Sequence, residues 1–317
     1  GSRVTIDAGA GADYIDNYAS RVAIDLGAGN DYIYNEGSSV TIDAGDGNDS
    51  IRNYSREGTV YKLSAGRDTI YGYNENDTIY VANSNYTTAK SGNHFVIGSG
   101  SDSLILAYSA NLKVMVRNSA GNVQTLNSNG SRVMNGDSLR NDILNTNSLV
   151  TINAGDGNDY ISNWSSSVKI DAGDGNDTIK NWSSSVKIDA GAGADSISLF
   201  SGNSYSDASS YGNNTISGGT GNDTVYLNSA TTVGNVYVYN SGDGSDTIYN
   251  VTKYDTVSIG GASYSTSASG NNFIISVGSG KMTFVNAKDT AFTILPTIPP
   301  VEIFTPGNDK YANTTAN

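Results

Sequence analysis

A repeat of 18 residues dominates the middle of the sequence, between Val150 and Asp195. Two successive copies read VTINAGDGNDYISNWSSS and VKIDAGDGNDTIKNWSSS, and a third begins VKIDAGAGAD. The same unit recurs near the N-terminus, where Asp13, Asp31 and Asp49 are again 18 residues apart. Self-similarity at a short fixed period is the signature of a solenoid, in which each copy packs against its neighbours. The repeat therefore constrains the chain to stack its copies along one axis.

Each repeat contains two short strands and two turns. Val168 and Ile170 alternate with the polar Lys169, so both apolar side chains are expected to point inward, as is Ile179 in the second strand. Glycines in the loop between the strands allow a tight turn, and a serine-rich segment closes the circuit. The pattern predicts an all-β fold of two tandem parallel β-rolls, with 18-residue turns stacked about 4.8 Å apart.

Stacked repeats bring one aspartate per turn to the same edge of the roll. Carboxylates about 5 Å apart repel each other by roughly 0.8 kcal/mol in water, and by more at a lower effective dielectric. A cation between neighbouring turns would convert this repulsion into attraction. Carboxylate oxygens and the carbonyl oxygens of glycine-rich loops suit Ca²⁺. Zinc is disfavoured, because the chain has no Cys and one His.

The loops also resemble a known repeat. Residues 218–226, GGTGNDTVY, match the nonapeptide G-G-x-G-x-D-x-U-x in full, and the other loops replace its first glycine with Ala or Leu. The sequence is therefore similar to the RTX (repeats-in-toxin) calcium-binding β-rolls, of the large bacterial extracellular or adhesin-like type. This resemblance adds weight to calcium as the bound ion and implies a chain that is exported unfolded and folds outside the cell.

The predicted metal ligands are the aspartate that ends each loop and the glycines before it. In the first roll they are Gly9, Gly11, Asp13, Gly27, Gly29, Asp31, Gly45, Gly47, Asp49 and Asp68. In the second roll they are Gly155, Gly157, Asp159, Gly173, Gly175, Asp177, Gly191, Gly193, Asp195, Gly219, Gly221, Asp223 and Asp246. Several ions are expected along one edge of each roll, with Asp68 and Asp246 at the ends of their rows.

The opposite edge has no glycine–aspartate loop and is expected to bind no calcium. It carries a row of asparagines at the same period, which should stack as an amide ladder: Asn17, Asn35, Asn53, Asn163 and Asn181. Aromatic residues follow them, Trp164 and Trp182 in the second roll and Tyr18 and Tyr54 in the first. Such rows are typical of side-chain packing across strands, and binding of flat sugar faces is the second interpretation.

Similarity at a constant offset between the two halves of the sequence predicts that the chain is a duplication of one module. Asp77-Thr78 resembles Asp255-Thr256, and Val60-Tyr61 resembles Val238-Tyr239. Each module is expected to be a roll followed by a strand-rich cap, since a solenoid needs atypical terminal units to close its apolar end. The predicted boundaries are 1–117 (roll about 3–60, cap about 61–117), a linker at 118–134, 135–295 (roll about 135–235, cap about 236–295), and 296–317 as a proline-containing linker with the start of a further repeat.

Composition and motifs indicate a binding or structural role. The net charge of −13 disfavours nucleic acid as a partner, and no stretch is long and apolar enough to cross a membrane. The single histidine, His94, corresponds to Asn272 in the duplicate, so we expect no catalytic base and no enzyme. The sequence predicts a calcium-folded, monomeric repeat segment of a secreted or cell-surface bacterial protein with an adhesive, matrix or spacer role, and glycans or surface polymers as further partners. A carbohydrate-binding accessory module of an extracellular enzyme is the alternative.

Overall fold

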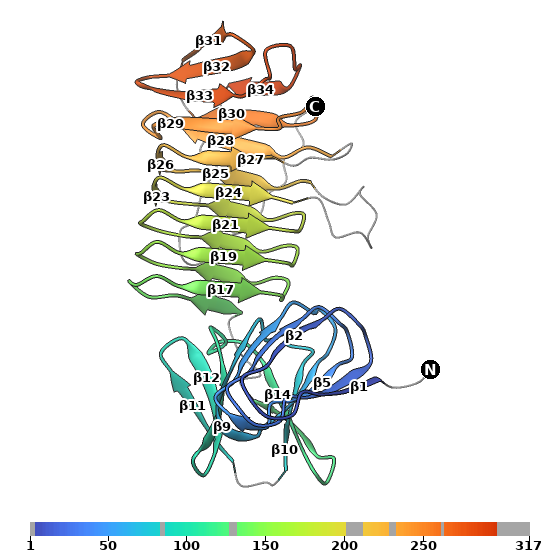
Figure 1. Ribbon diagram of the computed structural model, residues 1–317. Coiled ribbons are helices and arrows are strands. Elements are labelled where there is room, and N and C mark those ends of the chain that lie inside the picture. The colour runs from blue at the N-terminus through green and yellow to red at the C-terminus, as the bar shows by residue number, and fades with distance from the viewer. Residues whose placement is uncertain are drawn as a thin grey trace, which may run out of the picture.

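The fold consists of strands and turns, and the residues described below contain no helix. The computed structural model describes residues 4–82, 86–126, 132–200, 212–227, 233–260 and 263–296. Strands of successive repeats pair in parallel, and two rolls follow each other along the chain (Figure 1). The all-β class and the parallel roll predicted from the sequence period are confirmed. None of the described segments is a helix that could cross a membrane.

The first roll is made of two sheets, one from each strand of the repeat. The first sheet runs β1 (Val4–Asp7), β3 (Val22–Asp25), β5 (Thr41–Asp43), β8 (Val60–Lys62), β10 (Thr78–Val81), β14 (Val114–Asn118) and β15 (Val123–Leu126). The second sheet contains β2 (Tyr14–Asn17), β4 (Tyr32–Asn35), β7 (Ser50–Asn53) and β9 (Ala65–Tyr71). Residues one repeat apart face each other, as Ile15 faces Ile33. The register therefore follows the sequence period.

The second roll repeats this plan with more turns. Its first sheet runs β16 (Val133–Asn135), β18 (Thr151–Asn153), β20 (Lys169–Asp171), β22 (Lys187–Asp189), β25 (Thr215–Ser217), β28 (Val236–Asn240), β30 (Thr256–Gly260) and β34 (Thr293–Pro296). Its second sheet begins β17 (Asp142–Asn145), β19 (Tyr160–Asn163), β21 (Thr178–Asn181), β24 (Ser196–Leu199), β27 (Thr224–Tyr226) and β29 (Ser245–Tyr249). Short strands β6 (Asp46–Gly47), β23 (Ala192–Gly193) and β26 (Thr220–Gly221) lie in the loops.

Each roll continues into antiparallel strands with the same arrangement. In the first, β11 (Thr87–Ser91), β12 (His94–Ser99) and β13 (Asp102–Leu106) pair antiparallel in order, and β13 joins β9 in parallel. In the second, β31 (Tyr264–Ser269), β32 (Asn272–Val277) and β33 (Gly280–Phe284) do the same, and β33 joins β29. The segment predicted to be a linker contains β15, which pairs antiparallel with β14. The repeat start predicted after 296 lies outside the described residues.

The constant offset between the two halves holds in the strand register, with one correction. Phe95 faces Leu106, and Phe273 faces Phe284, at the same offset. Thr78 and Thr256 also correspond, but they pair with Val60 and Val236. The predicted match of Val60 with Val238 is therefore wrong, because Val236 takes the place of Val60. The reason is local, since the turn between the start of β28 and Asp246 is longer than its counterpart between Val60 and Asp68.

The core of each roll is a stack of inward-pointing aliphatic side chains. Ile24, Ile33, Ile42 and Ile51 in the first roll, and Ile170, Ile179 and Ile188 in the second, are all at most 3% exposed. They come from the positions that the alternating pattern assigns to the inside. Because each turn contributes few apolar groups, the roll is thin, and both of its edges lie close to the core.

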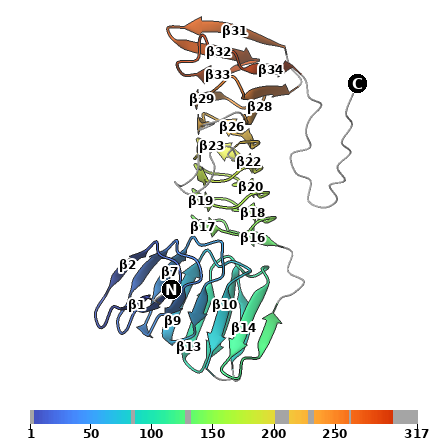
Figure 2. The ribbon, with the colours of Figure 1, turned by 90° about the vertical axis from the view of Figure 1, so that its right-hand side faces the viewer.

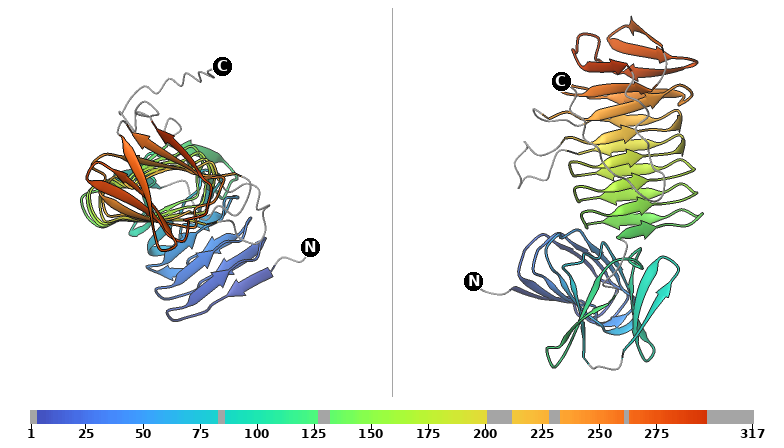
Figure 3. Two further views of the ribbon diagram at one scale, coloured as in Figure 1. Left: turned by 90° about the horizontal axis from the view of Figure 1, so that it is seen from above. Right: turned by 180° about the vertical axis from the view of Figure 1, so that it is seen from behind.

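The second roll stands on the side of the first. Figure 2 shows its opening turn, with β16 and β17, directly above the first roll near β7, and Figure 3 shows the two axes crossing. Arg52 forms an ion pair with Asp142 at 2.5 Å. Rings of Tyr54 and Trp164 meet edge to face, with centroids 5.0 Å apart. These contacts join the outer face of one roll to the first turn of the next.

Candidate metal centre

The aspartates that end the loops form one continuous row along an edge of each roll. Each lies just before a strand of the second sheet, so the parallel register stacks it on the aspartate of the next turn. Its Oδ1 accepts the backbone N–H of the preceding aspartate in the row. Asp13 N donates to Asp31 Oδ1 at 2.7 Å, and Asp159 N donates to Asp177 Oδ1 at the same distance. One carboxylate oxygen per turn is thus used by the fold itself.

The second oxygen of each of these carboxylates has no protein partner. Seven aspartate Oδ2 atoms are buried without a hydrogen bond, and they belong to Asp13, Asp31, Asp49, Asp159, Asp177, Asp195 and Asp223. Within the described residues, Thr59 Oγ1 is the only other buried side-chain atom in this state. A buried acceptor without a donor costs about 1–3 kcal/mol, and more when it is charged. The orphaned oxygens therefore coincide with the loop aspartates that the sequence period selects.

The two row-end aspartates differ, because a hydroxyl group serves their second oxygen. Ser64 Oγ donates to Asp68 Oδ2 at 3.2 Å. Tyr237 Oη donates to Asp246 Oδ2 at 2.6 Å. Both residues still accept the backbone N–H of the last loop aspartate, Asp49 and Asp223 respectively. The protein thus completes the C-terminal end of each row with its own donor and leaves the earlier positions open.

Burial makes the ionised form of these carboxyls unfavourable in the metal-free chain. Burial raises the pKa of Asp177 to about 6, that of Asp195 to about 7 and that of Asp223 to about 8. The neighbouring carboxylates of the row add to the increase. Desolvation and like charge both disfavour the charged state. A cation at this edge would remove both penalties.

The loop glycines are required by backbone geometry and by the closeness of successive turns. Gly173 and Gly175 have φ of +100° and +138°, a region that other L-residues rarely adopt. A Cβ on Gly175 would lie 1.8 Å from the carbonyl oxygen of Gly157 in the turn before. The loop backbones therefore stack in direct contact, and N–H groups of one turn bind glycine carbonyls of the turn before, as Ala192 N binds Gly173 O at 2.8 Å.

A calcium ion would have to use backbone as well as side-chain oxygens here. Among the described residues, no three Asp, Glu or His side chains converge on one point. Each turn supplies one orphaned carboxylate oxygen and the carbonyls of a glycine loop. Ca²⁺ accepts such a mixed set of six to eight oxygens, so the donor atoms present fit calcium.

A further row of carboxylates opens the same loops, and it was not among the predicted ligands. Asp7 faces Asp25 in the register, and Asp171 faces Asp189. Burial raises the pKa of Asp189 to about 6, and its charge also raises the pKa of Asp195. The signal was available, since these aspartates repeat with the same period. They lie at strand ends, where an outward carboxylate is ordinary.

The opposite edge forms the predicted amide ladder. Asn17 Nδ2 donates to Asn35 Oδ1 at 2.6 Å, and Asn35 Nδ2 donates to Asn53 Oδ1 at 2.8 Å. In the second roll, Asn163 Nδ2 donates to Asn181 Oδ1 at 2.7 Å and to the carbonyl of Ser165 at 2.9 Å. The row extends to Asn145, which was not among the predicted residues.

The aromatic row of the second roll packs face to face, whereas Tyr18 and Tyr54 of the first roll both contact Tyr34 with tilted rings. Trp164 stacks on Trp182 at 4.6 Å, and Trp182 stacks on Phe200 at 4.6 Å. The faces of the inner rings are therefore covered by the neighbouring rings. His94 is also structural, since its Nδ1 accepts the backbone N–H of Tyr108 at 3.1 Å.

Comparison with known proteins agrees with this geometry. The family model of the RTX calcium-binding nonapeptide repeat matches residues 2–18, 63–87, 150–164, 168–180 and 209–230. No curated protein matches the chain. A crystal structure of the extracellular lipase LipA from Serratia marcescens is similar at 14% identity and a TM-score of 0.27, over 81% of this chain and 38% of the lipase chain. The chain thus spans well under half of that lipase. The matched nonapeptide repeats and the parallel solenoid fit an RTX β-roll protein.

Proposed function

We propose that this chain is a structural repeat region of a secreted or cell-surface protein, and that calcium folds its two rolls. The ions would lie between neighbouring loops along the aspartate edge. Their ligands would be the orphaned Oδ2 atoms of Asp13, Asp31, Asp49, Asp159, Asp177, Asp195 and Asp223, with carbonyl oxygens of the adjoining loop glycines. The observation that carries the proposal is the coincidence of seven buried, unpartnered oxygens with the seven loop aspartates that precede Asp68 and Asp246 in their rows.

Calcium would supply positive charge where the protein provides only acceptors. The Oδ1 atoms remain bound to backbone N–H groups, so the row is held in place while each Oδ2 stays without a protein partner. Without the ion, each added turn buries another unpartnered oxygen beside a like charge. Metal-binding energy then becomes folding energy. Asp68 and Asp246 would take a smaller part, because Ser64 and Tyr237 already serve their outer oxygens.

Removal of calcium is the direct test. Far-ultraviolet circular dichroism of the full chain at about pH 8 should show the β spectrum in calcium and lose most of it in excess EDTA. Extracellular calcium modules bind at about 10⁻⁴–10⁻³ M, so refolding should occur in this range on titration. Magnesium at the same concentration is the control, because its smaller octahedral shell fits carbonyl loops poorly. An unchanged spectrum and melting temperature in EDTA would refute the proposal.

Within this role, an adhesive, matrix or spacer part of a larger extracellular protein suits the chain best. The two rolls form an elongated body (Figure 1). They contact each other through the Arg52–Asp142 ion pair and the hydrogen bond of Thr146 to the Gly72 carbonyl. A spacer needs stiffness along its length, and a stacked solenoid provides it. Calcium outside the cell would keep the rolls folded, whereas low cytosolic calcium would leave them unfolded before export.

Carbohydrate binding is the second candidate, and one place on the first roll favours it. Tyr14 is 66% exposed and stacks on Tyr32 at 5.1 Å with nearly parallel rings, so its outer face is open. A glycan array with the calcium-loaded chain tests this function. Binding that disappears in Tyr14→Ala would support it. Binding that persists there, or none at all, would leave the structural role alone.

A further inference from the structure

The first roll ends in a corner that carries the second roll. Residues 72–75 are all buried there. Three hydrogen bonds use backbone atoms of this corner: Gly72 O with Thr146 Oγ1 at 2.9 Å, Tyr73 O with Asn147 Nδ2 at 2.7 Å, and Glu75 N with Asn147 Oδ1 at 2.8 Å. The side chains of the opening turn of the second roll thus bind the backbone of the corner.

The same corner is present at residues 250–253 of the second roll. Gly72 and its counterpart Asn250 both have positive φ, of 78° and 60°. Two further hydrogen bonds recur at corresponding positions: Asn74 N with Asp77 Oδ2 and Thr252 N with Asp255 Oδ2, both at 2.8 Å. In each copy the aspartate Oδ1 also accepts a backbone N–H of the preceding turn at 2.7 Å. The backbone that binds a roll is therefore duplicated.

The second corner is more exposed than the first. Asn250 and Lys253 are exposed, and Tyr254 beside them is 43% exposed. On the adjoining sheet, Tyr226 is 37% exposed and stacks on Tyr249 at 4.7 Å. The equivalent pair in the first roll is Arg52 over Tyr71, and Arg52 binds Asp142 of the second roll. Exposed aromatic groups of the second roll therefore lie at the position that, on the first roll, contacts the second roll.

We propose that this surface, the corner at 250–253 with Tyr226 and Tyr249, docks the opening turn of a further roll of the same kind. The predicted contact is an Asn-Thr-Asn corner like residues 145–147, in which the side chain in the place of Asn147 would bind the carbonyl of Val251 and the amide of Lys253. Backbone hydrogen bonds carry over between the copies, because they do not depend on the side chains that differ. The proposal goes beyond the calcium role, since every contact in it is between protein groups.

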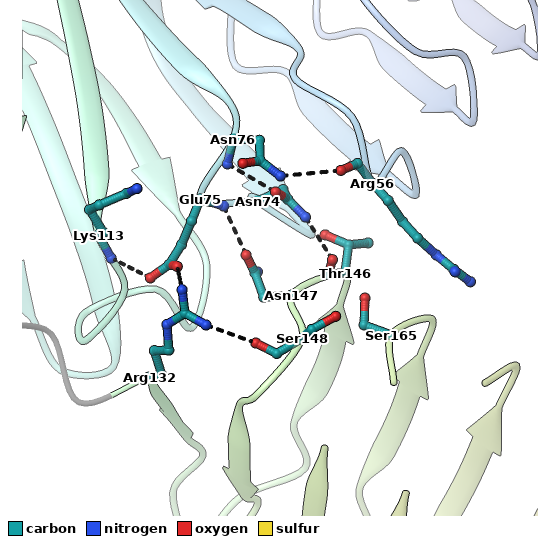
Figure 4. Close-up of a pocket in the computed structure, with 10 residues that line it drawn as sticks. All are labelled: Arg56, Asn74, Glu75, Asn76, Lys113, Arg132, Thr146, Asn147, Ser148 and Ser165. Carbon is teal, nitrogen blue, oxygen red and sulfur yellow. Dashed lines mark hydrogen bonds and ion pairs between the residues drawn. The ribbon is translucent and has the colours of Figure 1, made fainter. Parts of the chain in front are cut away.

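The side chains that differ indicate the chemistry of the incoming roll. At the first junction, Glu75 binds Arg132 at 2.6 Å beside a polar cavity of about 220 Å³, as Figure 4 shows. Lys253 replaces Glu75, so the residue in the place of Arg132 should be acidic. Tyr226 replaces Arg52, so an apolar or aromatic residue should stand in the place of Asp142. The second surface thus selects a related but different roll.

A tandem fusion tests this surface. Pro296 corresponds to Asn118 in the register, so residues 119–295 appended after Pro296 repeat the natural spacing of the first junction. Hydrogen–deuterium exchange in calcium then reports on the amides of residues 249–255. We expect their exchange to slow roughly tenfold or more relative to the parent chain. Thr146→Ala with Asn147→Ala in the appended copy alone should remove this protection, and Tyr226→Arg with Lys253→Glu should increase it.

Three outcomes would overturn the inference. The corner amides could exchange at the parent rate although the strands of the appended roll are protected. The appended roll could fail to fold, which counts against the surface because residues 119–295 form a roll behind the first corner. Finally, the parent corner could already be protected and become exposed when the chain is cut after Pro296. The occupant would then be the tail of this chain.

Discussion

The two edges of each roll are built from stacked polar side chains at the same period, but they differ in whether these side chains satisfy each other's hydrogen bonds. Along one edge, Asn163 donates to Asn181 and to its own turn, so both amide protons are used. Along the other, Asp177 accepts one backbone N–H through Oδ1 and leaves Oδ2 buried without a partner. The asparagine edge is complete in the protein alone, and the aspartate edge is not.

The difference follows from the hydrogen-bonding groups of the two side chains. An amide carries both donors and an acceptor, so identical amides can satisfy each other in a row of any length. An ionised carboxylate only accepts, so identical carboxylates cannot. A solenoid that repeats an aspartate therefore needs either a proton or a cation at every turn. Such an edge makes folding depend on solution conditions, whereas an asparagine edge does not.

A change of pH should have the largest effect, because it acts on the aspartate edge and not on the asparagine edge. In the metal-free chain, the carboxyls of Asp177, Asp195 and Asp223 have pKa values raised by burial to about 6, 7 and 8. A raised carboxyl pKa in the folded state favours folding fully below the unfolded value of about 3.9. This contribution is lost as pH rises through about 6 to 8. In excess EDTA, melting temperatures from circular dichroism should therefore fall as the pH rises from about 5, until the chain is unfolded near pH 8. The comparisons in EDTA below refer to about pH 5, where the metal-free chain is expected to stay folded.

Calcium at saturating concentration is the control for this pH series. The ion binds the ionised carboxylates, so the fall with rising pH should disappear. A flat melting profile in EDTA over the same pH range would contradict the role given to the aspartate edge.

Adding a methyl group at a loop glycine should have the next largest effect. A Cβ at Gly175 would meet the Gly157 carbonyl at 1.8 Å, and the backbone there has a φ of +138°. We expect Gly175→Ala to lower the free energy of unfolding by about 3 kcal/mol or more in calcium, measured by denaturant titration. Gly270→Ala, with a positive φ but open space around it, should cost about 1 kcal/mol.

Ser167 tests whether the turns at the asparagine edge also require glycine. It has a φ of 59° without being glycine, so the asparagine-edge turn tolerates a side chain. Ser167→Gly should change the unfolding free energy by less than about 1 kcal/mol. Equal losses for Gly175→Ala and Gly270→Ala would show that stacking of the loops does not require glycine.

The effect of Asp177→Asn on stability should change sign between calcium and EDTA. The new side chain keeps the acceptor for Asp159 N, but it removes a carboxylate from the two neighbouring gaps between turns. In calcium the melting temperature should fall, and the calcium midpoint should rise about tenfold, because affinity follows ligand charge. In EDTA the variant should be as stable as the parent or more so. Asp255→Asn is the control, because Thr252 serves Asp255 Oδ2. Its effect should not depend on calcium.

Sequence alone was sufficient for the parts of this structure that follow a period. The roll, its inward isoleucines, the aspartate row and the asparagine ladder all repeat once per turn, so one register places them all. The shift at Val60 and Val236 could not be predicted, since a longer turn moves a strand without changing its pattern. The contacts of Glu75 and Arg52 with the second roll could not be predicted either, because they join segments that are not related by the repeat. Which hydroxyl group serves Asp246 likewise depends on where the ring of Tyr237 points.

Asn181→Asp introduces a carboxylate into the amide ladder. The side chain can still accept from Asn163, but it loses the proton that Asn181 gives to the carbonyl of Ser183 at 2.8 Å. We expect a loss of about 1–3 kcal/mol in unfolding free energy. The loss should be equal in calcium and in EDTA, because one carboxylate among amides makes no calcium site. Rescue by calcium would mean that the two edges differ only in composition and not in loop geometry.

The smallest expected effect is at the end of the aspartate row. Tyr237→Phe removes the hydroxyl that donates to Asp246 Oδ2 at 2.6 Å, and so turns a completed position into an open one. In EDTA this should cost about 1–2 kcal/mol. In calcium the cost should be smaller, because the freed oxygen then resembles that of Asp223 and becomes available to an ion. Tyr239→Phe is the matched control, since its hydroxyl donates to the Gly244 carbonyl and not to a carboxylate. Its cost should be the same with and without calcium, and a calcium-independent cost for both variants would show that the row ends at Asp246 for a reason other than its hydroxyl partner.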